Sequence, residues 1–111
     1  MMKNLTNEQK NQTLFITLVQ QLQMQAWVSL GKIKNPVTDK MDKNLNLAKL
    51  SIDMLDMLKA KSQGNLSEDE KRLIDQTLSN LKLNFVDEKA KADREKTAES
   101  ATEQKAEEKS S

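Results

Sequence analysis

A chain of 111 residues has room for one small domain. Its 3% aromatic content, two Gly and single Pro exclude a β-sandwich or barrel, which needs frequent turns. Charged residues make up 32% of the chain but balance to a net charge of +1, so no overall field would gather nucleic acid or a membrane surface. The composition predicts a small all-α protein with an aliphatic core.

Histidine and cysteine are absent from the sequence. Disulfides, thiolate nucleophiles, zinc–thiolate sites and the commonest general base are therefore excluded. Gly31 and Gly64 are too few for a glycine-rich phosphate loop. The short apolar run at 14–19 is neither a secretory signal nor a membrane span. We expect a non-enzymatic cytoplasmic protein without a cofactor or small-molecule substrate.

The first predicted helix covers residues 6–30. Thr6 and Gln9 have the spacing of a capping box, and Gly31 can close the helix in the left-handed conformation. At 100° per residue, one broad face collects most of the apolar residues of this helix. These residues are Leu14, Phe15, Leu18, Val19, Leu22, Ala26 and Leu30.

A connector at 31–41 precedes the second predicted helix, at 42–61. Asn35-Pro36 predicts a turn, because Pro lacks an N–H and restricts the residue before it. Asp39 or Asp42 is the expected N-cap. Apolar residues cover roughly 240° of this helix: Met41, Leu45, Leu47, Ala48, Leu50, Ile52, Met54, Leu55, Met57 and Leu58.

The third predicted helix covers residues 67–86. Gly64, followed by Asn65, is expected just after the end of the second helix. Ser67 and Glu70 then form a second capping box at a helix end rich in acids. One apolar stripe follows the helical repeat at Ile74, Leu78, Leu81 and Phe85. The expected architecture is a three-helix hairpin or bundle.

The composition changes sharply after Val86. Residues 87–111 have Ala as their only apolar type and are dominated by Glu, Lys, Asp, Ser and Thr. Such a segment cannot bury enough surface to fold alone. We therefore expect a helical domain at 1–86, followed by a charged, largely disordered tail or a frayed extension of the third helix.

The second helix has more apolar surface than the third helix can cover within one chain. Because a small domain has little stability to spare, we expect another protein to cover the rest, most simply a second copy in a two-fold dimer. A compact monomer with the second helix at its centre is the alternative, in which the Met side chains fill core gaps. The predicted surface consists of Met24, Trp27, Val28, Leu47, Leu50, Met54, Met57 and Leu58.

A role in RNA or ribosome binding is the alternative function. The local basic excess near Trp27 would pair with phosphates while the ring stacks on a base. Asp39 and Asp42 dilute this charge, so a solvated loop is the competing interpretation. The basic residues are Lys32, Lys34, Lys40 and Lys43.

Paired carboxylates offer a third and weaker possibility. Asp53 and Asp56 lie one turn apart and would share a cation, but Lys49 is near enough to neutralise one of them. Ser29 and Ser51 lie on or near apolar helix faces without an activating partner, so we interpret them as small packing residues.

A series of short motifs between Leu30 and Val86 matches one known family. The motifs are Leu30-Gly31, Asn35-Pro36-x-Thr38, Leu47-Ala48-Lys49, Ile52-Asp53-x-Leu55-x-Met57-Leu58, Lys61-x-x-Gly64-Asn65-Leu66-Ser67-x-x-Glu70, and Leu78, Leu81, Lys82 and Phe85-Val86. In these residues the chain resembles the short bacterial proteins classed as domain of unknown function 1844. Asp39 departs from the pattern, since relatives commonly carry Gly there. The resemblance implies a helical intracellular protein and transfers no activity, cofactor, partner or site residue.

Overall fold

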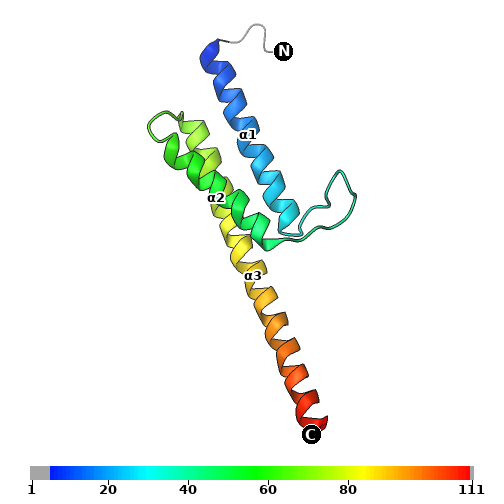
Figure 1. The fold of residues 1–111 in the computed structure, drawn as a ribbon. Coiled ribbons are helices and arrows are strands. Elements are labelled where there is room, and N and C mark those ends of the chain that lie inside the picture. The colour runs from blue at the N-terminus through cyan, green and yellow to red at the C-terminus, as the bar shows by residue number, and fades with distance from the viewer. Residues whose placement is uncertain (1–5, 111) are drawn as a thin grey trace.

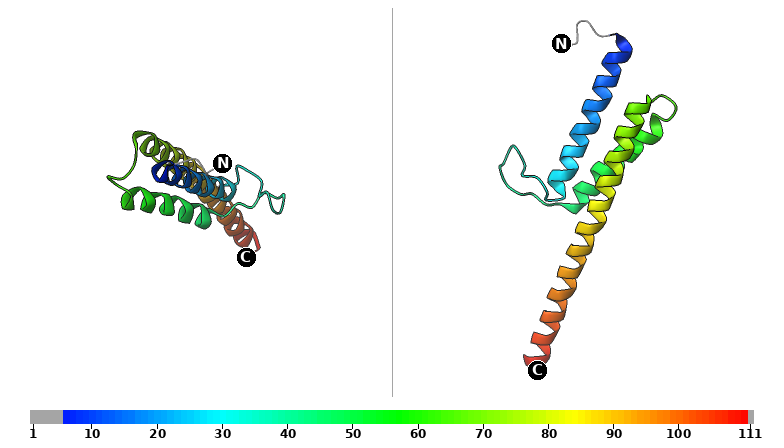
Figure 2. Two further views of the ribbon diagram at one scale, coloured as in Figure 1. Left: turned by 90° about the horizontal axis from the view of Figure 1, so that it is seen from above. Right: turned by 180° about the vertical axis from the view of Figure 1, so that it is seen from behind.

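The computed structural model describes residues 6–110, with side chains described as far as residue 97. Three helices follow one another: α1 (Asn7–Ser29), α2 (Leu45–Lys61) and α3 (Glu68–Ser110) (Figure 1). No strand occurs within residues 6–110. Each helix packs against the other two, as the end-on view in Figure 2 shows. The predicted all-α three-helix architecture is confirmed.

Both ends of α1 form as the sequence predicts. The Gln9 N–H donates to Thr6 Oγ1 at 3.1 Å, and the Thr6 N–H donates to Gln9 Oε1 at 3.0 Å, which completes the capping box. At the other end, Gly31 has a φ of 79°, and its N–H donates to the Val28 carbonyl at 3.0 Å. The left-handed glycine lets the chain leave the helix while a late carbonyl still accepts a hydrogen bond.

The start of α2 differs from the prediction. Asn44 is the N-cap, and neither Asp39 nor Asp42 fills that role. Asn44 Oδ1 accepts the two N–H groups of Asn46 and Leu47, at 3.1 and 3.2 Å. The Asn44 N–H also donates to the Ser29 carbonyl at 2.8 Å. This hydrogen bond to the end of α1 determines where α2 begins. It joins two segments, so capping preferences alone do not predict it.

The connector between α1 and α2 is an ordered turn around Asn35 and Pro36. Asn35 Oδ1 accepts the Val37 N–H at 2.9 Å, and the Asn35 N–H donates to the Lys40 carbonyl at 2.9 Å. The Asp39 N–H closes the turn by donating to the Asn35 carbonyl at 2.7 Å. This closure requires a φ of 57° at Asp39, where most L-residues are strained.

We predict that Asp39→Gly stabilises the protein by about 0.5 kcal/mol. Glycine removes the strain of the left-handed conformation, and part of that gain is lost to the greater freedom of the unfolded chain. Thr38→Gly is the matched control, because Thr38 does not have a positive φ and can only lose stability. Urea unfolding followed by circular dichroism compares the two; equal destabilisation by both would contradict the prediction.

The turn before α3 also follows the predicted pattern. The Ser67 N–H donates to Glu70 Oε1 at 2.9 Å, and the Glu70 N–H donates to Ser67 Oγ at 3.2 Å. Gly64 has the expected positive φ, 87°. Gly64 was expected as the first residue after the C-cap of α2 but is the second, because Ser62 is the C-cap. The Ser62 carbonyl accepts the Asn65 N–H at 2.9 Å.

The third helix extends beyond the predicted end at 86 and continues to Ser110. Ala, Glu and Lys favour a helical backbone even without a core to pack on. Lys91 Nζ lies 3.5 Å from Asp87 Oδ2 one turn earlier, a pair that supports the helix locally. The backbone therefore agrees with the predicted helical extension. Disorder of the tail stays a prediction, and Ser111 lies outside the described residues.

All three helices contribute to the core. Its fully apolar centre consists of Val19, Ala26 and Leu30 from α1 and the residue after it, Ala48, Ile52 and Leu55 from α2, and Ile74, Leu78 and Leu81 from α3. Phe85, the last member of the predicted α3 stripe, packs against this centre while half-buried. The α3 face is therefore placed as predicted.

Candidate functional site

The predicted partner surface divides into an exposed part and a part that belongs to the core. Trp27 and Leu58 are half-buried and pack against the core cluster, so they are not free for a partner. Val28 is also half-buried. The remaining members are exposed: Met24, Leu47, Leu50, Met54 and Met57.

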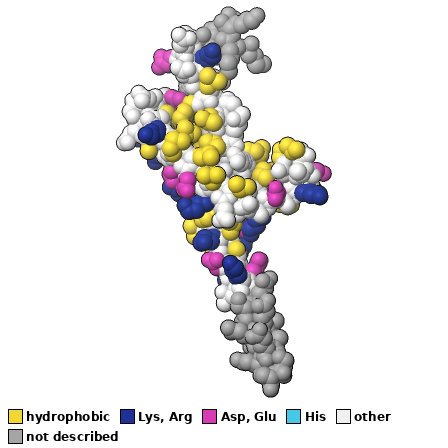
Figure 3. Space-filling model, in the orientation of Figure 1, with side chains coloured by type: hydrophobic (Ala, Val, Ile, Leu, Met, Phe, Trp, Pro, Cys, Tyr) yellow, Lys and Arg dark blue, Asp and Glu magenta, His cyan; other side chains and the backbone are white. Residues whose placement is uncertain are grey.

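Two residues of the predicted apolar face of α1 are exposed. Leu14 and Leu18 share the apolar side of α1, yet they remain 47% and 41% exposed. Hydrophobic side chains gather over α1 and α2 on one side of the molecule, as Figure 3 shows. We define the α1/α2 apolar surface as Leu14, Leu18, Met24, Leu47, Leu50, Met54 and Met57.

The α2 part of this surface has the spacing of a coiled-coil seam. Leu47, Leu50, Met54 and Met57 are separated by three, four and three residues, which matches the a and d positions of a heptad. The core side of α2 uses different residues, among them Ala48. The helix therefore presents one apolar stripe to its own chain and a second stripe to the solvent.

Charged side chains are absent from most of α1. No Asp, Glu, Lys or Arg occurs between Asn11 and Gly31, in a chain that is 32% charged overall. Thr13 Oγ1 donates to the Gln9 carbonyl at 3.0 Å, and Thr17 Oγ1 donates to the Thr13 carbonyl at 2.8 Å. These hydroxyl groups are satisfied within the helix, so covering them would leave no donor without a partner.

A shallow groove continues the surface toward the connector. It has a volume of about 330 Å³ and lies between the second half of α1, the connector and the start of α2. Met24 and Leu47 line it from the two helices, and Pro36 and Asp42 line it from the connector. The groove is open and mixed in polarity, which suits contact with protein better than enclosure of a small ligand.

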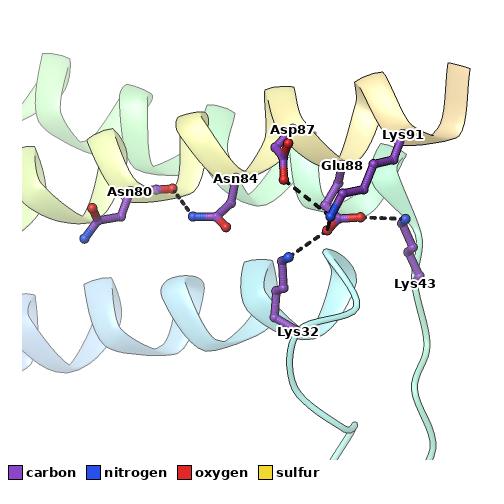
Figure 4. A network of polar contacts seen from close by, with 7 residues as sticks. All are labelled: Lys32, Lys43, Asn80, Asn84, Asp87, Glu88 and Lys91. Carbon is purple, nitrogen blue, oxygen red and sulfur yellow. Dashed lines mark hydrogen bonds and ion pairs between the residues drawn. The ribbon is translucent and has the colours of Figure 1, made fainter. Parts of the chain in front are cut away.

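The connector is held against α3 by one buried carboxylate (Figure 4). Glu88 Oε1 lies 2.7 Å from Lys32 Nζ, and Glu88 Oε2 lies 2.8 Å from Lys43 Nζ. Lys91 Nζ lies 3.5 Å from Oε1. The Glu88 side chain is only 8% exposed. Hydrogen bonds from Lys32 and then Lys43 lower the pKa of Glu88 from 4.5 to about 2, against the effect of burial.

This ion-pair cluster changes how the basic connector is interpreted. Lys32 and Lys43 are both paired with Glu88, whose single charge offsets one of their two charges, whereas Lys34 and Lys40 remain exposed in the connector. Trp27 is half-buried against the core rather than presented as a free stacking face. Both features reduce what the connector can offer to phosphates and bases.

The candidate carboxylate pair is likewise occupied by lysines. Asp53 Oδ2 lies 3.1 Å from Lys49 Nζ, and Asp56 Oδ1 lies 3.0 Å from Lys82 Nζ of α3. No group of three or more acidic side chains that would hold a metal ion occurs in the part of the chain whose side chains are described. Asp53 therefore pairs within α2 and Asp56 joins α2 to α3, both through surface ion pairs.

The two candidate serines are buried. Ser29 and Ser51 are 4% and 1% exposed, and Ser51 Oγ has no hydrogen-bond partner within the described residues. Ser51 lies beside Ala48 and Leu55 on the core side of α2, where a small side chain permits close helix packing. This position agrees with their interpretation as packing residues.

Comparison with known proteins identifies a family. Among the helices of residues 6–110, none combines the length and the hydropathy needed to cross a membrane. No curated protein and no solved structure matches the chain. The family described as "Domain of unknown function (DUF1844)" matches residues 12–88, a range that includes the α1/α2 apolar surface and ends at Glu88. The chain belongs to the DUF1844 family.

Proposed function

We propose that this protein is a non-enzymatic interaction module that binds protein through the α1/α2 apolar surface. The observation that supports this proposal most strongly is the second apolar stripe of α2, from Leu47 to Met57, which the described side chains leave exposed. Single exposed apolar side chains are normal on proteins, but a set that shares one face marks a contact surface.

The adjoining part of α1 supports the same function. Leu14 and Leu18 enlarge the apolar area, and the helix between Asn11 and Gly31 brings no charge that a partner would have to desolvate. Interface centres are depleted in charged residues for this reason. Met54 and Met57 add flexible side chains that adapt to a partner.

Crosslinking with mass spectrometry in the native cells tests this proposal. We expect crosslinked species containing this chain, and we expect Met54→Glu to remove them, because the new carboxylate would be buried without a partner. Leu83→Glu is the matched control, since Leu83 is 71% exposed on α3 and lies outside the surface. Crosslinked species that survive Met54→Glu unchanged would overturn the proposal.

A further inference from the structure

We infer that the partner is a second copy of this chain, bound in a two-fold dimer whose α2 helices pair antiparallel through the exposed stripe. This inference rests on the proposed function and names the partner of the same surface. It pairs Leu47 with the second copy's Met57, and Leu50 with its Met54, so that each a position meets a d position.

The stripe on α2 indicates a helix as the partner. Residues at 47, 50, 54 and 57 repeat at the interval that keeps a seam facing another helix. A second copy supplies an identical seam of the same length. Leu14 and Leu18 of α1 then flank the seam, so that the contact is broader than one pair of short helices.

The distribution of charge favours a copy of the same chain. Two identical surfaces repel each other when they are charged, but α1 is uncharged from Asn11 to Gly31. On α3, by contrast, Lys71, Arg72 and Asp87 are exposed. When the same surface of each copy faces the other, self-association closes as an isologous pair and does not continue into a filament.

The ends of α2 determine the direction of pairing. Lys59 and Lys61 lie in the last turn of α2, where Lys59 pairs with Asp75 of α3 at 2.7 Å. Parallel pairing would place the Lys61 side chains of the two copies next to each other and align the two helix dipoles, and both contacts are repulsive. Antiparallel pairing separates the two Lys61 side chains and opposes the dipoles.

The first experiment measures the mass of the purified full-length chain by sedimentation equilibrium. We expect twice the chain mass of 12.6 kDa at concentrations up to about 100 μM. Leu50→Glu should raise the dissociation constant at least about 100-fold while circular dichroism stays helical, because Leu50 is exposed in the single chain. Leu83→Glu should leave the mass unchanged.

The second experiment uses the absence of native cysteine. Chains carrying Leu50→Cys and chains carrying Met54→Cys are mixed and oxidised under equilibrating conditions. Antiparallel pairing predicts that the disulfide between the two different variants exceeds the disulfides within each variant. A preference for disulfides within each variant would contradict the proposed pairing direction.

The outcomes separate this inference from the proposed function. A wild-type mass of one chain throughout, or a dimer unaffected by Leu50→Glu, overturns the second copy as partner. If crosslinks to a different protein are nevertheless lost with Met54→Glu, the surface is an interaction site and only its partner has been misassigned. If Leu50→Glu leaves the mass unchanged and Met54→Glu leaves the crosslinks unchanged, both proposals fail.

Discussion

Replacing Leu55 by Ala is expected to lower the free energy of unfolding by about 3 kcal/mol. Leu55 is fully buried between the helices, so the substitution removes apolar contact and leaves a cavity that the packed core cannot fill. A loss of this size is a large part of the stability of a small domain. Urea unfolding followed by circular dichroism measures it, at one fixed protein concentration because association adds to stability.

The control removes the same atoms from an exposed position. Leu83→Ala deletes an identical side chain from α3, where it is 71% exposed, and should change the free energy of unfolding by less than about 0.5 kcal/mol. Similar losses for the two variants would mean that α2 does not pack at the centre of the core.

Replacing Glu88 by Gln should destabilise the protein by about 1–2 kcal/mol near pH 7. The carboxylate holds Lys32 and Lys43, whereas the neutral amide can accept a hydrogen bond but forms no ion pair with either lysine. Solvent reduces the loss, because these two lysine side chains are 35% and 40% exposed. Denaturant unfolding at neutral pH gives the difference directly.

The same substitution has a defined dependence on pH. The pKa of Glu88 is lowered from 4.5 to about 2 in the folded chain, so its contribution is present above 4.5 and is lost as the pH falls toward 2. The wild type and Glu88→Gln should therefore converge over this range. Asp53→Asn, which breaks the exposed pair with Lys49, is the control and should cost less than about 0.5 kcal/mol. A constant difference between wild type and Glu88→Gln down to pH 2 would contradict the assignment.

Local chemistry made most of the helix boundaries predictable. The capping boxes at Thr6 and Ser67 and the glycine at 31 are specified by residues a few positions apart. Asn44 was not found, because Asp39 and Asp42 are equally good caps in isolation. The choice depends on the hydrogen bond from the Asn44 N–H to the Ser29 carbonyl, a contact between segments far apart in the sequence.

The sequence predicts that α1 and α2 carry the apolar surface, but it does not predict which residues at the margin of that surface are exposed. A helical wheel groups Leu14 with Val19, yet only Val19 is covered, because α2 and α3 together reach across part of the apolar face. The heptad interval from Leu47 to Met57 was a readable signal that would have separated the exposed stripe from the core stripe. Glu88 lies in a segment whose composition resembles a solvated tail, and only the fold brings Lys32 and Lys43 to it.

The length of α3 affects how the molecule moves through solution. The chain spans 75 Å along its longest axis and 16 Å along its shortest, with a radius of gyration of 19.6 Å. A compact domain of the same length would have a radius of gyration of about 13 Å. A rod of this shape experiences extra friction, so a single chain would leave a gel-filtration column at the volume of a larger globular protein. Elution volume alone would therefore make a monomer look like a dimer.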